Sequence, residues 1–257
     1  MNEEALLSRA KDLKLYGLIA HWDEIPSSHL GFLEQLLIWE GDERFGRSLQ
    51  RRLSGAKLGA FKLLSDFDWQ WPKKCDKEAI DECLELDFIK TTTNIVLCGP
   101  NGVGKSTIAR NIAHNAVING YTALFVTAGQ MLNDLASQDG DNALRRRIKY
   151  YTQPDVLVID EVGYLSYSNR HADLVFEIVS RRYEKNPTVI TTNKPFAEWN
   201  EIFPNASCVV SLIDRLIHRS EIISIEAESF RLKEAKEQSI KRKESRTKRK
   251  STKKEPF

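Results

Sequence analysis

The chain has 257 residues, of which 41% are hydrophobic and 29% charged, and its formal net charge is +2. This length and composition fit one α/β domain with a smaller accessory domain, and they are typical of a soluble protein. No apolar run approaches the roughly 20 residues that span a bilayer, and residues 1–14 lack the apolar core of a signal peptide. The cysteine spacing contains no CxxC pair, which argues against a zinc site or a disulfide framework. We therefore expect a cytoplasmic protein with no membrane partner.

The charge is unevenly distributed along the chain. Residues 231–257 carry 12 Lys/Arg and 4 Asp/Glu, whereas the first 230 residues carry 26 Lys/Arg and 32 Asp/Glu. The low complexity of the end of this segment predicts a disordered tail. A basic tail on an acidic body favours a polyanionic partner, above all a nucleic acid. The alternative is a solvated tail that binds nothing specific.

Residues 1–65 are predicted to form a small helical N-terminal domain. The later part of this segment places apolar side chains four residues or multiples of four apart, close enough to the helical period to form one face: Leu33, Leu37, Phe45, Leu49 and Leu53. The polar face of the same helix carries four arginines: Arg44, Arg47, Arg51 and Arg52. We expect this domain to serve oligomerisation or contacts with DNA or a partner protein.

Residues 66–230 have the pattern of an α/β domain. A short aromatic connector with Phe67, Trp69 and Trp71 comes first. Five apolar, β-branched runs follow, at residues 94–99, 122–128, 155–161, 188–193 and 222–226, and helical patterns separate them. Continuous apolar strands that alternate with helices indicate a parallel sheet covered on both faces. The sequence therefore predicts a parallel five-stranded sheet covered by helices.

The first of these strands leads into a phosphate-binding motif. Residues 99–106, GPNGVGKS, fit GxxxxGK[ST] at every fixed position, and a helical pattern begins within the motif. The glycines let backbone N–H groups turn toward phosphates, and the helix N-terminus adds partial positive charge. Lys105 would neutralise the β- and γ-phosphates of ATP, and Ser106 would offer an oxygen to Mg²⁺. The predicted nucleotide-binding residues are Gly99, Pro100, Asn101, Gly102, Val103, Gly104, Lys105, Ser106 and Thr107.

The third strand carries the matching acidic pair. Residues 156–161, VLVIDE, place Asp160 and Glu161 at the carboxyl end of a buried strand, where ligands bind in α/β sheets. Asp160 would hold Mg²⁺ together with Ser106. Glu161 would act as the general base that polarises the attacking water. An apolar run that ends in Asp-Glu is common by itself, so this assignment depends on the preceding phosphate-binding motif.

The order of the motifs narrows the class of ATPase. A complete strand, residues 122–128, separates the phosphate-binding strand from the acidic strand, which is typical of P-loop ATPases with an inserted strand. Asn193 ends the next strand and could orient the attacking water, the role called sensor 1. The alternative for Asn193 is an ordinary turn residue.

Two arginines follow on a predicted helix. AAA+ proteins present an arginine from this region to the nucleotide of a neighbouring subunit, where it stabilises the charge of the transferring phosphoryl group. Arg215 is the first candidate for this role in trans and Arg219 is the reserve candidate, and the sequence leaves open which of the two acts. The alternative for Arg215 is a surface arginine paired with Asp214 or Glu221.

These motifs resemble those of the IstB family, the ATPase helper proteins of a class of bacterial insertion sequences, which are related to the helicase loader DnaC. The similar runs are GPNGVGKS, VLVIDEVGYL, SRRYE, TTNKPFAEW and DRLIHRS, together with the N-terminal FLEQLLIWEGDERFGRSLQRRLSGAKL and LSDFDW, so the resemblance covers nearly residues 1–235. Asn101 stands where the family often has proline and Ser106 where it often has threonine. Neither change disturbs phosphate or metal chemistry.

The resemblance implies an AAA+ fold and an ATP-dependent homo-oligomer that binds and remodels double-stranded target DNA and recruits a transposase. Little chain follows Arg215, so we expect the AAA+ helical lid to be reduced or absent, with Arg231 as a weak candidate for a second sensor arginine. DnaC-like proteins carry an extra helix in the region of residues 130–153, which faces a central channel. The resemblance therefore implies backbone contacts with DNA from Arg145, Arg146, Arg147 and Lys149. A solvated helix face is the alternative.

Three functional hypotheses remain open at the level of sequence. The first is an ATPase that assembles on DNA and assists a transposase. The second is a helicase loader of the DnaC type. The third is a nucleotide-gated DNA-binding scaffold with little turnover, which the presence of Glu161 disfavours.

Overall fold

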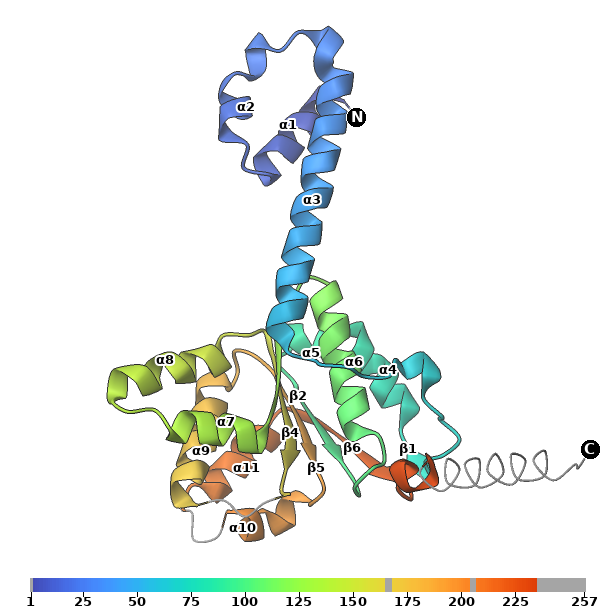
Figure 1. Cartoon of the computed structure of the whole chain (residues 1–257), viewed down its shortest axis with the longest axis vertical. Coiled ribbons are helices and arrows are strands. Elements are labelled where there is room, and N and C mark those ends of the chain that lie inside the picture. Colours follow the sequence, from blue (N-terminus) through green and yellow to red (C-terminus); the bar gives the residue numbers. More distant parts are fainter. Residues whose placement is uncertain (1, 165–167, 204–206, 235–257) are drawn as a thin grey trace, which may run out of the picture. The chain divides into compact units, whose positions relative to one another are not determined.

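The computed structural model describes residues 2–164, 168–203 and 207–234. The chain divides into two compact units, residues 1–54 and 55–257 (Figure 1). The boundary therefore lies before the position at residue 65 that the sequence suggested. The expected basic tail, residues 231–257, lies outside the described residues except for its first four positions, which continue a helical turn that begins at Phe230.

The N-terminal unit is helical, as predicted. Helices α1 (Glu3–Asp12), α2 (Tyr16–Ala20) and α3 (Leu30–Ala56) are joined by the 3₁₀ turns η1 (Trp22–Glu24) and η2 (Ser27–His29). The Asn2 side chain caps α1 by accepting a hydrogen bond from the Ala5 N–H. The core of this unit consists of side chains from α1, η1 and the first turns of α3: Leu6, Ala10, Trp22, Leu33 and Leu37.

The arginines of α3 form local ion pairs within the N-terminal unit. Arg44 contacts Glu40, one turn earlier, and also donates to the Leu13 carbonyl. Arg47 pairs in the same way with Glu43, at 3.3 Å. Because these guanidinium groups already have acidic neighbours, the positive charge of this helix face is partly balanced.

The second unit is built on one sheet. Its strands are β1 (Lys74–Cys75), β2 (Asn94–Cys98), β3 (Ala123–Thr127), β4 (Val156–Val162), β5 (Thr188–Thr192) and β6 (Ser220–Glu226), in the order β1-β6-β2-β5-β4-β3. The five predicted strands are parallel. The sequence missed the sixth strand, β1, which pairs antiparallel with the end of β6. A two-residue strand leaves no alternating pattern to detect.

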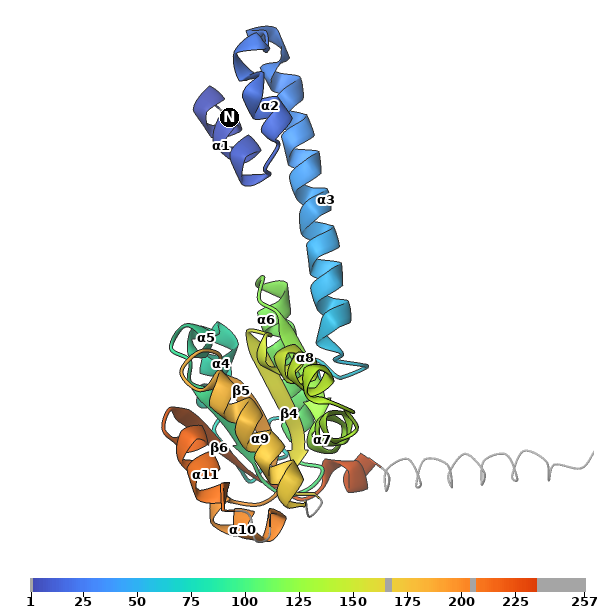
Figure 2. The same ribbon diagram turned by 90° about the vertical axis from the view of Figure 1, so that its left-hand side faces the viewer.

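Helices cover both faces of this sheet. On one face lie α4 (Lys77–Glu85) and α6 (Lys105–Ile118), and α5 (Asp87–Lys90) follows α4. The opposite face packs against α7 (Ala128–Ala136), α9 (Asn169–Arg182) and α11 (Val209–Ile217), with α8 (Asp141–Thr152) against α7 and α9. Helices α9 and α11 run side by side (Figure 2), and α10 (Trp199–Ile202) precedes α11. None of the described helices combines the length and apolar character that a membrane crossing requires.

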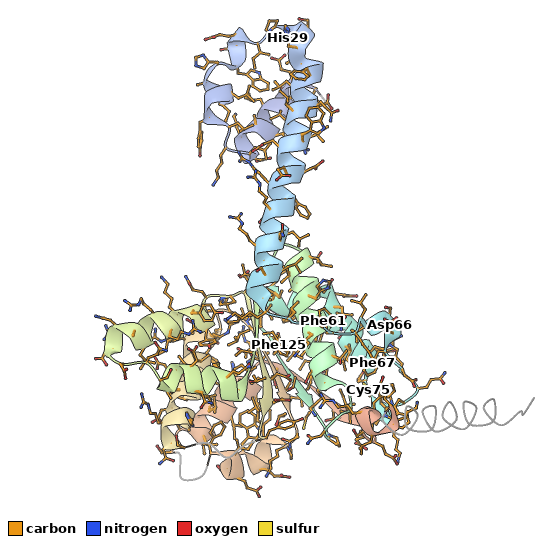
Figure 3. All side chains as sticks on the ribbon, viewed as in Figure 1. His29, Phe61, Asp66, Phe67, Cys75 and Phe125 are labelled. Atoms are coloured by element: carbon orange, nitrogen blue, oxygen red, sulfur yellow. The ribbon has the colours of Figure 1, made fainter. Side chains whose placement is uncertain are left out.

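Residues 55–65 belong to the second unit because they pack along α6. Asn111 on α6 donates to the Lys62 carbonyl at 2.9 Å, and its Oδ1 accepts from the Leu64 N–H at 3.1 Å. Phe61, labelled in Figure 3, packs against His114 in an edge-on arrangement with ring centroids 5.5 Å apart. The 3₁₀ turn η3 (Leu64–Asp66) follows. The chain thus enters the α/β unit along the helix that carries the phosphate-binding motif.

A buried arginine joins the amino ends of β4 and β5 to the end of α9. Arg182 is 1% exposed. Its guanidinium donates to Thr188 Oγ1 and to four backbone carbonyls, those of Thr152, Pro154, Asp155 and Pro187. Burial lowers the pKa of Arg182 to about 9, and the charge of Asp155 opposes this effect. The hydrogen bonds replace the hydration that the cation loses on burial.

We expect Arg182→Met to lower the free energy of unfolding by about 2–4 kcal/mol, because it leaves several buried acceptors without a donor. The adjacent Arg181 provides a matched control, since it is half exposed and pairs with Glu177 at 2.6 Å. Arg181→Met should cost about 1 kcal/mol or less. Urea unfolding followed by circular dichroism measures both. Equal losses in the two variants would contradict the structural role of Arg182.

Candidate functional site

The phosphate-binding loop joins β2 to α6, and α6 begins at Lys105. Its glycines are needed for packing as well as for backbone geometry. A Cβ added at Gly104, which has φ +105°, would lie 2.5 Å from Cε2 of Phe67. A Cβ at Gly102 would collide with the Ser229 hydroxyl, and one at Gly99 with the Ile225 carbonyl. Segments far away in the sequence therefore lie directly against the loop.

Lys105 is folded over its own loop. Its side chain is 4% exposed, and Nζ donates to the Gly99 carbonyl at 2.6 Å and the Pro100 carbonyl at 2.7 Å. Burial lowers the pKa of Lys105 to about 8, although nearby acidic groups, including Asp160 and Glu161, raise it. A lysine held only by neutral carbonyls at the mouth of a glycine loop suits an anionic ligand, because phosphate oxygens would favour its charged form.

Asp160 and Ser106 meet as the sequence predicts. The Ser106 hydroxyl donates to Asp160 Oδ1 at 2.8 Å, and Asp160 is 3% exposed. A second hydroxyl, that of Thr191 on β5, donates to the same oxygen. Hydroxyl and carboxylate oxygens are the ligands that Mg²⁺ uses in phosphate sites, so this pair fits the predicted metal.

Glu161 follows Asp160 in an unusual backbone conformation. Its φ is +64°, in the left-handed region that residues with a side chain seldom occupy. The β4–β5 register shifts between Ile159 and Val162, so the two acidic residues lie in an irregularity of the ladder. The Glu161 N–H donates to Thr191 Oγ1 at 2.9 Å. This local bend places the predicted general base at the carboxyl end of the sheet.

Asn193 directly follows β5 and carries an unsatisfied polar atom. Its Oδ1 is buried and has no hydrogen-bond partner within the described part of the chain. A Cβ added at Gly163, just after β4, would lie 3.0 Å from this oxygen. Asn193 therefore lies beside the chain that leaves the acidic strand. A buried amide oxygen without a donor is consistent with a site for a water or another ligand.

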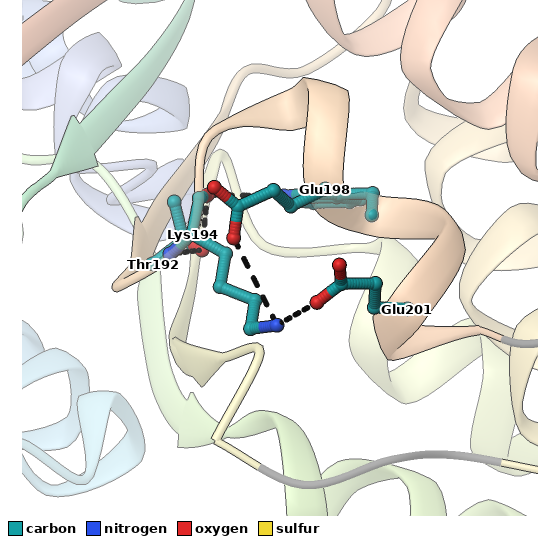
Figure 4. A network of polar contacts seen from close by, with 5 residues as sticks. Thr192, Lys194, Glu198 and Glu201 are labelled. Atoms are coloured by element: carbon teal, nitrogen blue, oxygen red, sulfur yellow. Dashed lines mark hydrogen bonds and ion pairs between the residues drawn. The ribbon is translucent and has the colours of Figure 1, made fainter.

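The turn that carries Asn193 is held from both sides (Figure 4). Thr192 Oγ1 accepts from the Lys194 N–H at 3.1 Å and donates to the Lys194 carbonyl at 2.9 Å. Lys194 Nζ forms ion pairs with Glu198 and Glu201, which lie on the 3₁₀ turn η4 (Phe196–Glu198) and on α10. These contacts fix the backbone on either side of the amide.

Two segments outside the parallel core close the pocket around the loop, and we call them the clasp. One is the connector, residues 61–71, and the other is the C-terminal segment, residues 226–234. Trp71 Nε1 donates to the Glu228 carbonyl at 2.9 Å, and the Phe230 N–H donates to the Gly102 carbonyl at 2.9 Å. Ion pairs join Lys62 to Glu234 (2.6 Å) and Lys233 to Asp68 (3.4 Å).

The pocket between the loop and the clasp is lined by Phe67, Trp71, Lys105, Tyr164, Phe230 and Arg231, among others. From the sequence, Phe67 and Trp71 belong to an aromatic connector without a functional role, and Arg231 is a weak candidate for a second sensor arginine. The aromatic character of these side chains was the one sequence signal for a pocket wall. No spacing rule links residues of the connector with residues near the end of the chain. In the described chain a short helical turn follows β6.

The two candidate arginines, Arg215 on α11 and Arg219 just after this helix, differ in their surroundings. Arg215 donates to the Ser180 hydroxyl and lies over the Phe176 ring, 4.6 Å from its centroid, so its partners belong to α9 rather than being Asp214 or Glu221. Arg219 is exposed. Neither arginine lines the pocket of its own chain as far as the chain is described. The predicted trans role of Arg215 therefore has a structural alternative, in which its contacts with α9 join α11 to α9 within one chain.

The basic residues of α8 also separate into two kinds. Arg145, Arg146 and Lys149 are exposed. Arg147 instead pairs with Asp134 on α7 and lies over the Tyr150 ring, 4.3 Å from its centroid. Arg147 therefore joins α7 to α8, and the other three cations carry the exposed positive charge of this helix.

The lowered pKa of Lys105 leads to a test of nucleotide binding. In the free protein the lysine loses its proton as the pH rises through about 8, whereas bound phosphates favour the charged form. ATP affinity should therefore fall above pH 8, and binding near pH 8.5 should take up part of a proton. Calorimetry in two buffers of different ionisation enthalpy measures this uptake. A binding reaction without proton exchange at that pH would contradict the assignment.

Solved structures share the fold of the second unit. The crystal structure of DnaI aligns with a TM-score of 0.54 and 19% identity, over 67% of this chain and 90% of that one. The replication initiator DnaA, in a structure with AMPPCP and single-stranded DNA, aligns with a TM-score of 0.50 and 18% identity, over 59% of this chain and 45% of that one. At these identities the likeness concerns the fold, which is the P-loop AAA+ fold that the motifs predict.

Relatives in sequence come from bacterial insertion sequences. A protein of insertion sequence IS5376 from Geobacillus stearothermophilus, named for ATP binding, is 36% identical over 217 residues, which are 84% of this chain and 86% of the relative. A similarly named protein of IS21 from Pseudomonas aeruginosa is 33% identical over 243 residues, 92% of this chain and 91% of the relative. The family model of the IstB-like ATP binding proteins matches residues 8–238. Together with the phosphate-binding loop and its acidic partner strand, these matches show that the chain belongs to the IstB-like ATP-binding family.

Proposed function

We propose that this protein is an AAA+ ATPase that hydrolyses ATP to ADP and phosphate and uses the reaction to control its assembly on double-stranded DNA. The main support is the convergence of Lys105, Ser106 and Asp160 with Glu161 and Asn193 at the carboxyl ends of three neighbouring strands. The unsatisfied Asn193 oxygen adds to this support, since it lies where a water-orienting amide is expected.

Each group has a distinct task in the proposed reaction. The loop amides and Lys105 bind the phosphates and balance their charge. Ser106 and Asp160 would hold Mg²⁺, which lowers the negative charge that the attacking water meets. Glu161 accepts a proton from that water while Asn193 orients it. The oxygen of the water forms a bond to the γ-phosphorus, the bond to the β–γ bridging oxygen breaks, and ADP leaves with that oxygen.

Arg231 completes the phosphate side of the pocket in this proposal. It lies on the clasp, lines the pocket with Lys105, and its charge lowers the pKa of that lysine. A second cation this near the loop suits the high negative charge of a triphosphate better than that of a diphosphate. The clasp would thus serve as a short substitute for the AAA+ lid.

The proposed biological role is assistance to a transposase, because the sequence relatives belong to insertion sequences. The helicase-loader hypothesis has its support in the shared fold of DnaI, at much lower identity. The scaffold hypothesis has less support, because it leaves Glu161 and Asn193 without a role. We therefore favour the transposition ATPase, acting as a homo-oligomer with a transposase as partner.

The trans arginine can be identified by mixing variants. We favour Arg219, because it is exposed while Arg215 contacts Ser180 and Phe176 on its own chain. Arg219→Ala and Lys105→Ala subunits should each hydrolyse ATP poorly. An equal mixture should recover about a quarter of the wild-type rate if subunits mix at random and sites act independently.

Arg215→Ala and Glu161→Gln serve as the comparison variants in this experiment. If Arg215 acts within its own subunit, its mixture with Lys105→Ala gives no recovery. Glu161→Gln should bind ATP but lose turnover. Its mixture with Lys105→Ala should also give no recovery, because each site then lacks either Lys105 or Glu161 even where a neighbour supplies Arg219. Recovery with Arg215→Ala but not with Arg219→Ala would reverse the assignment. Absence of recovery with either arginine variant, in hetero-oligomers verified by mass spectrometry, would count against a trans arginine.

The proposed DNA contacts of α8 have a distinct salt signature. Changing Arg145, Arg146 and Lys149 to glutamine should weaken ATP-dependent DNA binding and reduce the slope of log affinity against log salt by about 1 for each phosphate that the helix no longer neutralises. Arg147→Gln is the matched control, because its contacts with Asp134 and Tyr150 make it structural. It should lower the unfolding midpoint and leave the salt slope unchanged. Fluorescence anisotropy with labelled duplex DNA measures the slope.

The predicted tail provides an independent comparison. Deleting residues 241–257 should lower DNA affinity at low salt and flatten the salt slope, while ATP-dependent assembly persists because the nucleotide motifs lie upstream. An unchanged affinity and slope would identify the tail as a solvated extension.

A further inference from the structure

The end of β5 contains a hydroxyl group with no role in the proposed reaction. Thr191 is 1% exposed, and its side chain makes two hydrogen bonds to the acidic strand. Its hydroxyl donates to the carboxylate of Asp160, and its Oγ1 accepts from the backbone N–H of Glu161 at 2.9 Å. One buried hydroxyl therefore contacts both the predicted metal ligand and the predicted general base.

The backbone of Glu161 depends on this contact. Ile159 pairs with Ile190, and Val162 pairs with Thr192, so two residues of β4 stand opposite one residue of β5. Glu161 has φ +64°, a strained conformation for an L-residue because Cβ approaches the following carbonyl oxygen. The Glu161 N–H lacks a carbonyl partner in the ladder at this position, and the Thr191 oxygen serves as its acceptor instead.

The orientation of the Asp160 carboxylate also depends on Thr191. In the structure its Oδ1 accepts hydrogen bonds from both Ser106 and Thr191. Ser106 and Asp160 are both residues that would hold Mg²⁺, whereas Thr191 is not a predicted ligand. Its hydroxyl is therefore a donor outside the predicted metal site that orients this buried carboxylate.

We propose that Thr191 is a positioning residue of the ATPase site, whose hydroxyl sets the direction of the Asp160 carboxylate and holds Glu161 in its left-handed conformation. This inference rests on the proposed ATPase function. It assigns to β5 a part in hydrolysis separate from that of Asn193, and it predicts that loss of one hydroxyl misplaces the general base while leaving the phosphate-binding loop intact.

A buried threonine could instead contribute to strand packing only. Thr188 at the other end of β5 represents that case, since it is 2% exposed and its Oγ1 accepts from Arg182 at 3.2 Å. Thr188→Val and Thr191→Val remove the same atom from the same strand. Thr191→Ser keeps the hydroxyl and removes the methyl group, so it separates hydrogen bonding from packing.

The first readout is independent of activity. Amide hydrogen exchange of Glu161 in the nucleotide-free protein should be at least about tenfold faster in Thr191→Val, because the N–H loses its acceptor, and unchanged in Thr191→Ser and Thr188→Val. Isotope-edited NMR or exchange mass spectrometry of residues 159–164 measures this rate. Unchanged protection in Thr191→Val would overturn the proposal.

The second readout is the division between kcat and KM. Thr191→Val should lower kcat by at least about tenfold with KM for ATP within about twofold, since ATP binding depends on the loop. Thr191→Ser should keep most of the turnover, and Thr188→Val should lower the unfolding midpoint with little loss of kcat. Equal loss in Thr191→Ser and Thr191→Val would assign the effect to packing and reject the proposal. A wild-type protein without turnover would reject the ATPase function itself, while the exchange result would still test the positioning of Glu161.

Discussion

The buried carboxylate of Asp160 is the contact on which the candidate site depends. An ionised carboxyl group at 3% exposure is costly unless hydrogen bonds replace its hydration. The two donors are the hydroxyls of Ser106 at the start of α6 and Thr191 at the end of β5. These hydrogen bonds to one buried carboxylate therefore join the phosphate-binding loop, β4 and β5. The positions of Lys105 and Asn193 follow from this junction.

Much of this junction could be predicted because its parts are short, continuous motifs. The loop from Gly99 to Ser106 is contiguous, and continuous apolar runs mark the parallel strands β2 to β6. Ligand groups collect at the carboxyl ends of parallel strands, so the sequence alone could place Asp160 and Asn193 at the same edge. The role of Thr191 could not be predicted in this way, because its contacts depend on the register shift opposite Glu161.

Other features escaped prediction because they join distant segments without a periodic signal. Trp71 contacts Glu228, and Lys62 contacts Glu234, across more than half of the chain. Arg147 has the same residue type and helix as Arg145 and Arg146, yet the nearby Asp134 makes it a structural residue. Helical spacing shows which residues share a face, but it does not show which tertiary partner each side chain meets.

The clasp forms one wall of the pocket through contacts that are individually modest. Its ion pairs are partly exposed, and such pairs contribute about 0–1 kcal/mol each. The rings contribute more, since Trp71 stacks on Phe230 and Lys233 lies over Trp71, 4.3 Å from the ring centroid. Several modest contacts therefore hold this wall of the pocket together. Because Phe230 also donates to the Gly102 carbonyl, movement of this wall would act directly on the phosphate-binding loop.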